Sequence, residues 1–195
     1  MSDYHVRLWV KQMISYLEQL FSLRGKMAVV TGAGRGLGRE VAIAMAKRKA
    51  YVCCIDVNFP NRIPRSLENN LFNKYCDITD LTSFKSICVE IFDRYNKIDV
   101  LINNAGVTYT KKDNELYPQE QWDKTISINL TAAFTCSQIV YEYMFKNKKG
   151  SIINITSISA ELGFPNNPAY IASKGGGNAN KSTCKRLGNK WNKSQ

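Results

Sequence analysis

Two residues near the C-terminal end of the sequence have the spacing of an acid/base pair. Tyr170 and Lys174 are four residues apart and follow Pro168, so on a helix that begins there they lie on one face. A phenol has a reference pKa near ~10, but an ammonium group a few ångströms away favours the phenolate and lowers that pKa. The pair could then act as a general acid/base near neutral pH. Ser157, after a predicted strand, could place a hydroxyl beside the same substrate oxygen.

The spacing Tyr-x-x-x-Lys is common on helix surfaces by itself, so it indicates a catalytic pair only when a second motif accompanies it. Residues 31–38 read TGAGRGLG, directly between a predicted strand and a predicted helix. Glycines let the backbone approach a pyrophosphate, and the helix N-terminus supplies free N–H groups and a positive dipole end. The turn therefore predicts a bound dinucleotide, with contacts from Gly32, Arg35, Gly36, Leu37 and Gly38.

One carboxylate bears on the choice between NAD and NADP. Asp56 ends the second predicted strand, near the place where an acidic residue bonds a ribose 2′-hydroxyl. A 2′-phosphate would meet that carboxylate, which favours NAD. Arg35 has the opposite effect, because a guanidinium in the turn could pair with the phosphate. We weigh the like-charge clash more heavily and predict NAD, with NADP as the alternative.

The elements that must position these residues alternate between strands and helices. From Lys26 onward, continuous apolar runs of strand length are separated by helical patterns, which is typical of βαβ units and a parallel sheet covered on both faces. The sequence therefore predicts an α/β, doubly wound Rossmann fold. The predicted strands are 27–31, 51–55, 71–75, 100–103 and 151–156, the predicted helices lie near 36–49, 81–96, 118–145 and 169–186, and residues 58–70 are mostly loop.

Residues 1–24 form a separate predicted unit, and residues 25–195 form the Rossmann domain. Apolar residues recur at helical spacing from Val6 to Phe21, so this segment is an amphipathic helix. We expect it to dock on the domain or on a partner subunit. The alternative is a membrane-surface anchor, which is less favoured because only two basic residues lie on the helix before Arg24.

The composition excludes several classes of site. The only histidine is His5, so a Ser-His-Asp hydrolase or a zinc site with several imidazoles has almost no residues to use. The six cysteines include no CxxC pair, which argues against a disulfide framework or a metal site. We interpret them as small buried hydrophobes of a protein in the reducing cytosol.

The net charge of +11 raises the question of nucleic-acid binding. Six basic residues and no acidic one lie between Lys174 and Gln195, so we interpret much of the excess as a solvated chain end. We expect no specific nucleic-acid partner, although a basic nucleic-acid-associated protein remains an alternative. No stretch reaches the ~18 consecutive apolar residues of a membrane span, and no signal cleavage site follows the N-terminal helix. We therefore expect a cytoplasmic protein.

Together, the motifs resemble the short-chain dehydrogenase/reductase family across residues 25 to about 191. The combination is highly specific, although each piece alone is not. The matches occur in the family's order: TGAGRGLG (31–38), Asp77 in CDITD, NNAG (103–106), Asn129 in INL, Ser157 after IINIT, and YIASK (170–174). Residues 20–26, LFSLRGK, also look like the lead-in of members that act on sugar acids and polyols.

The resemblance implies catalytic roles for four residues. Tyr170 would exchange the proton with the substrate oxygen, and Lys174 would lower the phenol pKa and hold the nicotinamide ribose. Ser157 would orient the carbonyl or alcohol. Asn129 would keep a water in the proton relay. The implied reaction is NAD(P)-dependent hydride transfer between the nicotinamide and a secondary alcohol or ketone of the sugar-acid, polyol or 3-oxoacyl type.

The resemblance also implies cofactor contacts away from the reacting atoms. Asp77 and Ile78 would contact the adenine, and Asn104 to Gly106 would line the cofactor path, although the asparagines of these motifs are partly structural in the family. The resemblance also implies a small-molecule alcohol or ketone substrate. For a full-length form it implies a homo-oligomer.

The sequence departs from the family after the helix that carries Tyr170 and Lys174. Family members continue with two more strands, a Pro-Gly turn under the nicotinamide and a helical substrate lid, whereas this chain stops at Gln195. We therefore expect a Rossmann domain that is truncated at its C-terminus, with 151–156 as an apolar edge strand. The alternative function is a catalytically inactive dinucleotide-binding fragment.

Overall fold

The structure is a computed structural model that describes residues 3–111, 116–163 and 165–176. Its centre is one parallel sheet with the strand order β3-β2-β1-β4-β5. The strands are β1 (Met27–Thr31), β2 (Tyr51–Asp56), β3 (Leu71–Tyr75), β4 (Val100–Asn103) and β5 (Ser151–Asn154). The chain runs outward from β1 to β3 and then crosses back to β4 and β5. The predicted doubly wound α/β fold is confirmed, and its strand order reverses between β1 and β4, where such folds bind ligands.

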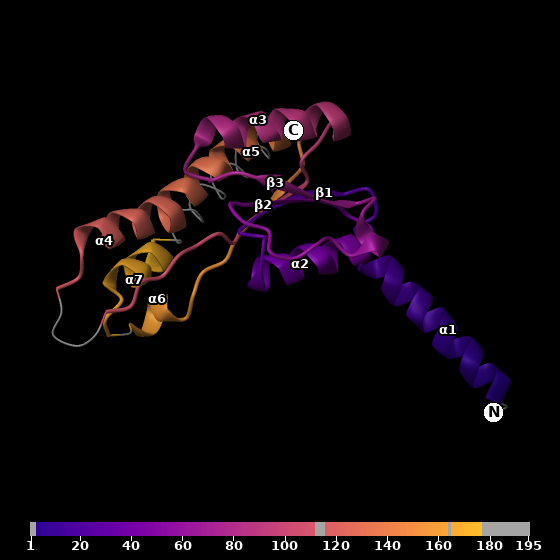
Figure 1. The fold of residues 1–195 in the computed structure, drawn as a ribbon. Helices are drawn as coiled ribbons and strands as arrows, with labels where there is room; N and C mark the ends of the chain where they lie inside the picture. The colour runs from indigo at the N-terminus through magenta and orange to yellow at the C-terminus, as the bar shows by residue number, and fades with distance from the viewer. Residues whose placement is uncertain (1–2, 112–115, 164, 177–195) are drawn as a thin grey trace.

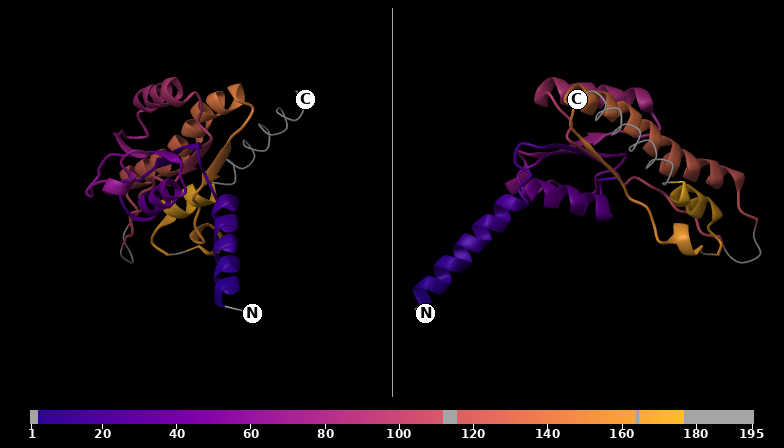
Figure 2. Two further views of the ribbon diagram at one scale, coloured as in Figure 1. Left: turned by 90° about the vertical axis from the view of Figure 1, so that its right-hand side faces the viewer. Right: turned by 180° about the vertical axis from the view of Figure 1, so that it is seen from behind.

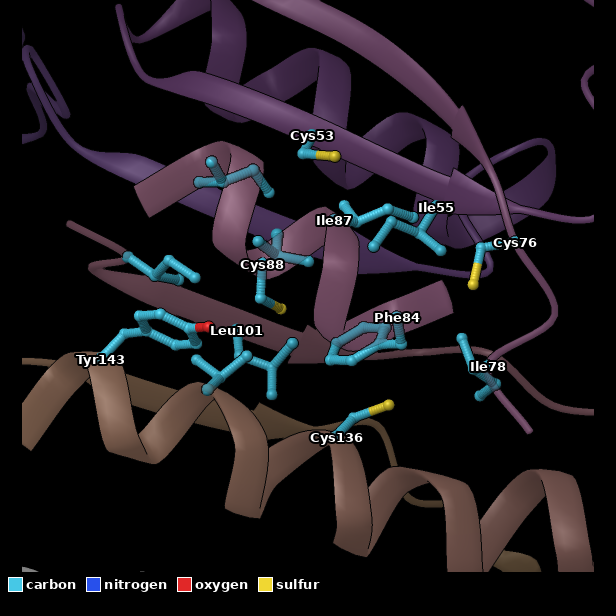
Figure 3. Packing of buried hydrophobic residues seen from close by; sticks show 14 of the residues in the cluster. Cys53, Ile55, Cys76, Ile78, Phe84, Ile87, Cys88, Leu101, Cys136 and Tyr143 are labelled. Atoms are coloured by element: carbon cyan, nitrogen blue, oxygen red, sulfur yellow. The ribbon is translucent and has the colours of Figure 1, made fainter. Parts of the chain in front are cut away.

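Helices cover both faces of the sheet (Figure 1). On one face, α2 (Gly36–Lys47) packs on the even-numbered core positions of β1, such as Ala28 and Val30. On the other face lie α3 (Leu81–Tyr95) and α5 (Ala133–Lys146), which bury a larger cluster that includes Phe84 (Figure 3). All five residues of β1 are buried, as expected of a central parallel strand.

Three shorter helices gather at the end of the sheet that is opposite to the N-terminal helix (Figures 1 and 2). They are α4 (Gln119–Ile126), α6 (Ser159–Leu162) and α7 (Pro168–Gly175). The π-helical segment η2 (Ser127–Ala132) joins α4 to α5, so the predicted helix 118–145 is continuous but not uniformly α-helical. The loop predicted over 58–70 contains only the 3₁₀ turn η1 (Arg65–Leu67).

Two predicted boundaries differ from the structure. β5 ends at Asn154 and not at residue 156, because the carbonyl of Ile155 accepts a hydrogen bond from Lys174 at 2.7 Å. β5 lies at the edge of the sheet, as predicted, and Ile153 on it is 45% exposed. Of the helix predicted over 169–186, α7 accounts for the first part; residues 177–195, which include the basic chain end and Cys184, lie outside the described residues.

The N-terminal helix does not dock on the domain in the structure, whereas its docking on a partner subunit stays a prediction. Helix α1 (Asp3–Leu20) projects away from the sheet (Figures 1 and 2), and its apolar side chains stay exposed, Trp9 at 63% and Leu20 at 60%. The two core clusters are formed by the sheet with α2 on one face and with α3 and α5 on the other, and α1 contributes no residue to either of them. None of the described helices is both long enough and apolar enough to cross a membrane.

Candidate active site

The glycine-rich turn is held tightly between the ends of β1 and β4. The side-chain amide of Asn104 donates to the carbonyls of Thr31 at 3.0 Å and Gly32 at 2.9 Å. The Thr31 hydroxyl accepts from the backbone N–H of Asn104 at 3.1 Å and of Ala105 at 3.2 Å. Asn104 therefore has a structural contact here: its amide fixes the turn, while the NNAG backbone runs past the carboxyl end of β1.

Close packing explains why Gly38 is a glycine. A Cβ built on Gly38 would lie 2.3 Å from the Gly32 carbonyl oxygen and 2.3 Å from the Asn104 amide nitrogen. Both distances are too short for a methyl carbon, so an alanine does not fit at position 38 unless its neighbours move. Gly38 thus allows the first turn of α2 to press against the turn that follows β1.

Gly36 has a different reason to be a glycine. It begins α2 with a φ of +57°, in the left-handed region, and a Cβ there would meet nothing within 4 Å. The N-cap residue Arg35 makes no side-chain capping bond, and Arg35 and Leu37 are exposed. The first N–H groups of α2 therefore face open space at the positive end of the helix dipole, which is the arrangement that binds a phosphate.

Asp56 lies directly beside this turn. Its carboxylate accepts from the backbone N–H of Gly34 at 2.8 Å and from that of Asn58 at 3.1 Å. The carboxylate is thereby fixed at the carboxyl end of β2, next to the phosphate-binding turn. A negative charge in this place suits a ribose diol and opposes a 2′-phosphate.

Asp77 and Ile78 follow β3, on the same edge of the sheet as Asp56. The Asp77 carboxylate accepts from the backbone N–H of Thr79 at 2.9 Å and from its hydroxyl at 2.8 Å, and Asp77 is exposed. The Ile78 side chain is 6% exposed and packs in the core under α3 (Figure 3). A nucleotide at this edge would consequently meet the Ile78 backbone and not its side chain.

The predicted acid/base pair lies on α7. The Lys174 ammonium is 5.8 Å from the centroid of the Tyr170 ring, so the two side chains share a helix face as the spacing predicts. The ammonium also donates to the carbonyl of Ile155 at 2.7 Å. Burial lowers the pKa of Lys174 below its ordinary value of 10.5, because the charged form loses contact with water.

Asn129 is buried in the π-helical segment η2 and clamps the loop that follows β4. Its amide oxygen accepts from the backbone N–H of Val107 at 2.8 Å, and its amide nitrogen donates to the Val107 carbonyl at 2.9 Å and to the Ser173 hydroxyl at 3.1 Å. Gly106 lies beside both Asn129 and Lys174. The structure thus brings NNAG, Asn129 and the Tyr-Lys helix to one place.

A cavity of about 20 Å³ lies among these residues. Such a volume holds about one water molecule. Its lining is largely polar and includes Asn103, Asn129 and Lys174. The side-chain oxygen of Asn103 is buried without a hydrogen-bond partner in the described part of the chain, so it offers an acceptor to a water placed here.

Ser157 follows β5 and precedes α6. Its hydroxyl lies 3.1 Å from that of Ser159 and accepts from the Ser159 backbone N–H at 3.2 Å. Helix α6 packs on α7, so Ser157 lies on a segment that adjoins the helix of Tyr170. The printed hydrogen bonds of the Ser157 side chain are to Ser159, and the contact with the helix of Tyr170 is made by α6.

Sequence reasoning missed two side chains that support the site. Ser173 is 1% exposed, accepts from Asn129 and donates to the Tyr170 carbonyl at 2.8 Å, so it joins η2 to α7. Its position inside YIASK was the available signal. Arg39 is 4% exposed and donates to the Asn73 side chain at 3.3 Å and to the Arg62 carbonyl at 3.1 Å, which anchors the loop after β2.

These observations fit a nicotinamide dinucleotide. The open space at Gly36 and the uncapped N-terminus of α2 would receive the pyrophosphate, and Asp56 would receive the adenosine ribose. Lys174, beside Gly106 and Tyr170, would lie at the nicotinamide end. In contrast, no group of three or more His, Cys, Asp or Glu among the described residues could hold a metal ion.

Comparison with known proteins agrees with this geometry. A family model described as short chain dehydrogenase matches residues 26–192. The chain is 33% identical over 161 residues to the 3-oxoacyl-(acyl-carrier-protein) reductase FabG of Thermotoga maritima, covering 79% of this chain and 64% of that protein. It is 32% identical over 184 residues to the 2-dehydro-3-deoxy-D-gluconate 5-dehydrogenase of Bacillus subtilis, covering 91% and 70%.

A third relative is the NAD-dependent glycerol dehydrogenase of Listeria innocua, 34% identical over 156 residues, covering 79% of this chain and 61% of that protein. The chain therefore spans about two thirds of the length of the curated relatives it matches. With the family model matched from 26 to 192 and the motif residues gathered at the carboxyl ends of the strands, the chain belongs to the short-chain dehydrogenase/reductase family of oxidoreductases.

Proposed function

We propose that this chain binds NAD(H) in preference to NADP(H). The observation that carries the proposal is the Asp56 carboxylate, fixed by the N–H groups of Gly34 and Asn58 at the side of the phosphate-binding turn. The carboxylate would accept hydrogen bonds from a ribose diol, whereas a 2′-phosphate would place like charges together. Arg35, exposed at the N-cap of α2, is the group that would favour NADP(H).

We further propose that the whole protein oxidises a secondary alcohol or reduces the corresponding ketone. When bound, the nicotinamide supplies or accepts the hydride. Tyr170 exchanges the proton at the substrate oxygen, and the Lys174 ammonium lies 5.8 Å from the centroid of its ring. Ser157 orients that oxygen, and a water in the 20 Å³ cavity between Asn129 and Lys174 passes the proton on.

The substrate class that we propose is a sugar acid, a polyol or a 3-oxoacyl thioester. The names of three relatives support it, since they specify a 3-oxoacyl-(acyl-carrier-protein), 2-dehydro-3-deoxy-D-gluconate and glycerol. The described residues supply the cofactor side and the proton donor.

Cofactor titration tests the first part. NADH and NADPH are titrated into the original chain, Asp56→Ala, and the control Asp93→Ala, which removes an exposed carboxylate from α3. We expect tighter NADH binding in the original chain and the control, and a narrower preference in Asp56→Ala. Equal or tighter NADPH binding by the original chain contradicts the assignment of NAD.

Turnover with sugar acids, polyols and 3-hydroxyacyl thioesters tests the second part. Tyr170→Phe should lower kcat by about 10²–10⁴, because general acid/base catalysis is lost while the ring is kept. Tyr141→Phe on α5 is the matched control and should leave kcat unchanged. Activity of Tyr170→Phe near the original level refutes the role of Tyr170. Cofactor binding with no turnover of any substrate identifies the chain as the inactive dinucleotide-binding alternative.

A further inference from the structure

Helix α1 presents a continuous apolar face to solvent. At about 100° per residue, its exposed apolar side chains cover an arc of about 160° of the helix surface. Their exposed fractions lie between 44% and 63%. The set is Val6, Trp9, Val10, Met13, Ile14, Tyr16, Leu17 and Leu20 of α1, together with Phe21 directly after the helix. A soluble helix normally buries such a face, so this one is shaped for a partner outside the described residues.

The apolar face continues into a groove where the chain enters the domain. Leu20, Phe21 and Leu23 line a cavity of about 450 Å³ together with Ala44 and Met45 of α2. The Leu23 backbone N–H donates to the carbonyl of Arg48, the C-cap residue of α2, at 2.8 Å, which ties the segment after α1 to the end of α2. An apolar molecule on α1 could therefore extend into this groove without a break.

A basic hollow adjoins the groove. Its volume is about 540 Å³, and four cations line it, Arg24, Lys47, Arg48 and Lys49, against one carboxylate, that of Glu18. Arg48 and Ser22 line both cavities. All four cations are exposed, and within the described part of the chain none of them forms an ion pair. The combined surface, defined as the α1 face with its groove and basic hollow, suits a partner that is apolar on one side and anionic beside it.

Two occupants of the α1 face can be compared. A second copy would meet it through the same patch, which brings a second basic hollow and no additional acidic surface. The arc of about 160° is also wider than the a/d seam that two helices bury in a coiled coil. A lipid surface is apolar below and anionic at its headgroups, and interfacial helices carry aromatic residues such as Trp9 and Tyr16 at the boundary of the two.

We propose that α1 lies in the surface of a bilayer that contains anionic phospholipid. The apolar face of α1 lies among the upper acyl chains, and the basic hollow faces the headgroup phosphates. Apolar burial supplies the binding and the four cations supply the preference for anionic lipid, since each basic residue near such a surface contributes about a fivefold increase in partition.

Vesicle flotation tests this proposal. The 195-residue chain is mixed with vesicles of pure phosphatidylcholine or of equimolar phosphatidylcholine and phosphatidylserine. We expect it to float with the anionic vesicles, and we expect the fluorescence of Trp9 to shift to shorter wavelength as the indole leaves water. Trp9→Phe should abolish that shift and keep the flotation.

Three variants separate the contributions. Leu17→Ser removes apolar area and should lower partition about tenfold or more, whereas Gln12→Ser on the polar face is the matched control and should change nothing. Arg48→Gln with Lys49→Gln should lower partition into anionic vesicles about fivefold for each charge. Because α1 lies outside the domain core and the side chains of Arg48 and Lys49 are exposed, circular dichroism should show all variants folded.

Three results would overturn the proposal. The first is that the folded chain does not float with anionic vesicles. The second is equal flotation with both kinds of vesicle, which would leave the basic hollow without its assigned role. The third is self-association without lipid that Leu17→Ser abolishes, detected by analytical ultracentrifugation, because the α1 face would then bind a second copy.

Discussion

Gly38→Ala places a methyl group where the first turn of α2 meets the end of β4. The new Cβ would lie 2.3 Å from the Gly32 carbonyl oxygen, a backbone atom, and 2.3 Å from the Asn104 amide nitrogen. The steric clash is relieved only if α2 moves outward or if the Asn104 amide gives up its hydrogen bonds to the carbonyls of Thr31 and Gly32. Either movement loosens the joint between the phosphate-binding turn and the NNAG loop.

The expected loss of stability follows from these contacts. Overpacking costs about 1–3 kcal/mol, the two hydrogen bonds of Asn104 contribute about 1 kcal/mol each, and alanine gains about 1 kcal/mol over glycine in a helix. The free energy of unfolding should therefore fall by about 2–4 kcal/mol. This is a large share of the total stability of a domain.

Gly36→Ala is the matched control, two residues away on the same turn. Its Cβ would meet open space, so the cost is the positive φ alone, about 1–2 kcal/mol. The methyl group would, however, occupy space in front of the α2 N-terminus and weaken NADH binding. Urea unfolding followed by circular dichroism and NADH titration measure the two effects. The reasoning is refuted if Gly38→Ala is no less stable than Gly36→Ala, or if Gly36→Ala binds NADH as tightly as the original chain.

Three further changes have defined outcomes. Asn129→Ala removes three hydrogen bonds between η2, the loop after β4 and α7, so urea unfolding should show a loss of about 2–4 kcal/mol; a loss below about 1 kcal/mol would mean that the clamp is dispensable. Burial lowers the pKa of Lys174 in the folded state, so between that lowered pKa and 10.5 the unfolded state binds more protons than the folded state. The free energy of unfolding of the original chain should therefore rise with pH in this range, relative to that of Lys174→Met. A difference in unfolding free energy between the two chains that does not change with pH contradicts this. Burial raises the pKa of Cys54 to about 11 and of Cys88 to about 12, so iodoacetamide near neutral pH should alkylate both only after unfolding, as mass spectrometry of peptides would show; labelling of the native chain would contradict it.

The sheet could be predicted from the sequence because its strands are buried on both faces. The run Met27–Thr31 is continuously apolar up to its threonine, so its bounds were visible without tertiary information, and the structure agrees. The end of β5 was harder to predict, since the Ile155 carbonyl leaves the ladder to bind Lys174, a residue of α7. The position of α1 relative to the domain could not be predicted, because periodicity identifies an apolar face but does not identify what covers it.

The candidate site was predictable as a set of residues and less so as a set of contacts. The spacing of Tyr170 and Lys174 placed both on one helix face, which is a local property. The contact of Asp56 with Gly34 and the position of Ser173 between Asn129 and α7 depend on how separate elements meet. Such contacts carry no local pattern and require the assembled sheet.

The π-helical turn at Ser127–Ala132 also sets the direction in which the side chains of α5 point relative to those of α4. Wider turns hold more residues than α-helical ones, so the faces of α4 and α5 are out of phase with each other by about one residue, or about 100°. This offset allows α5 to keep Cys136 and Val140 on the sheet while Asn129 turns toward the loop after β4. Deleting one residue here would restore an unbroken α-helix and rotate one half of it relative to the other. This segment therefore tolerates insertions and deletions less well than the loops around it do, and it can vary mainly by substitution.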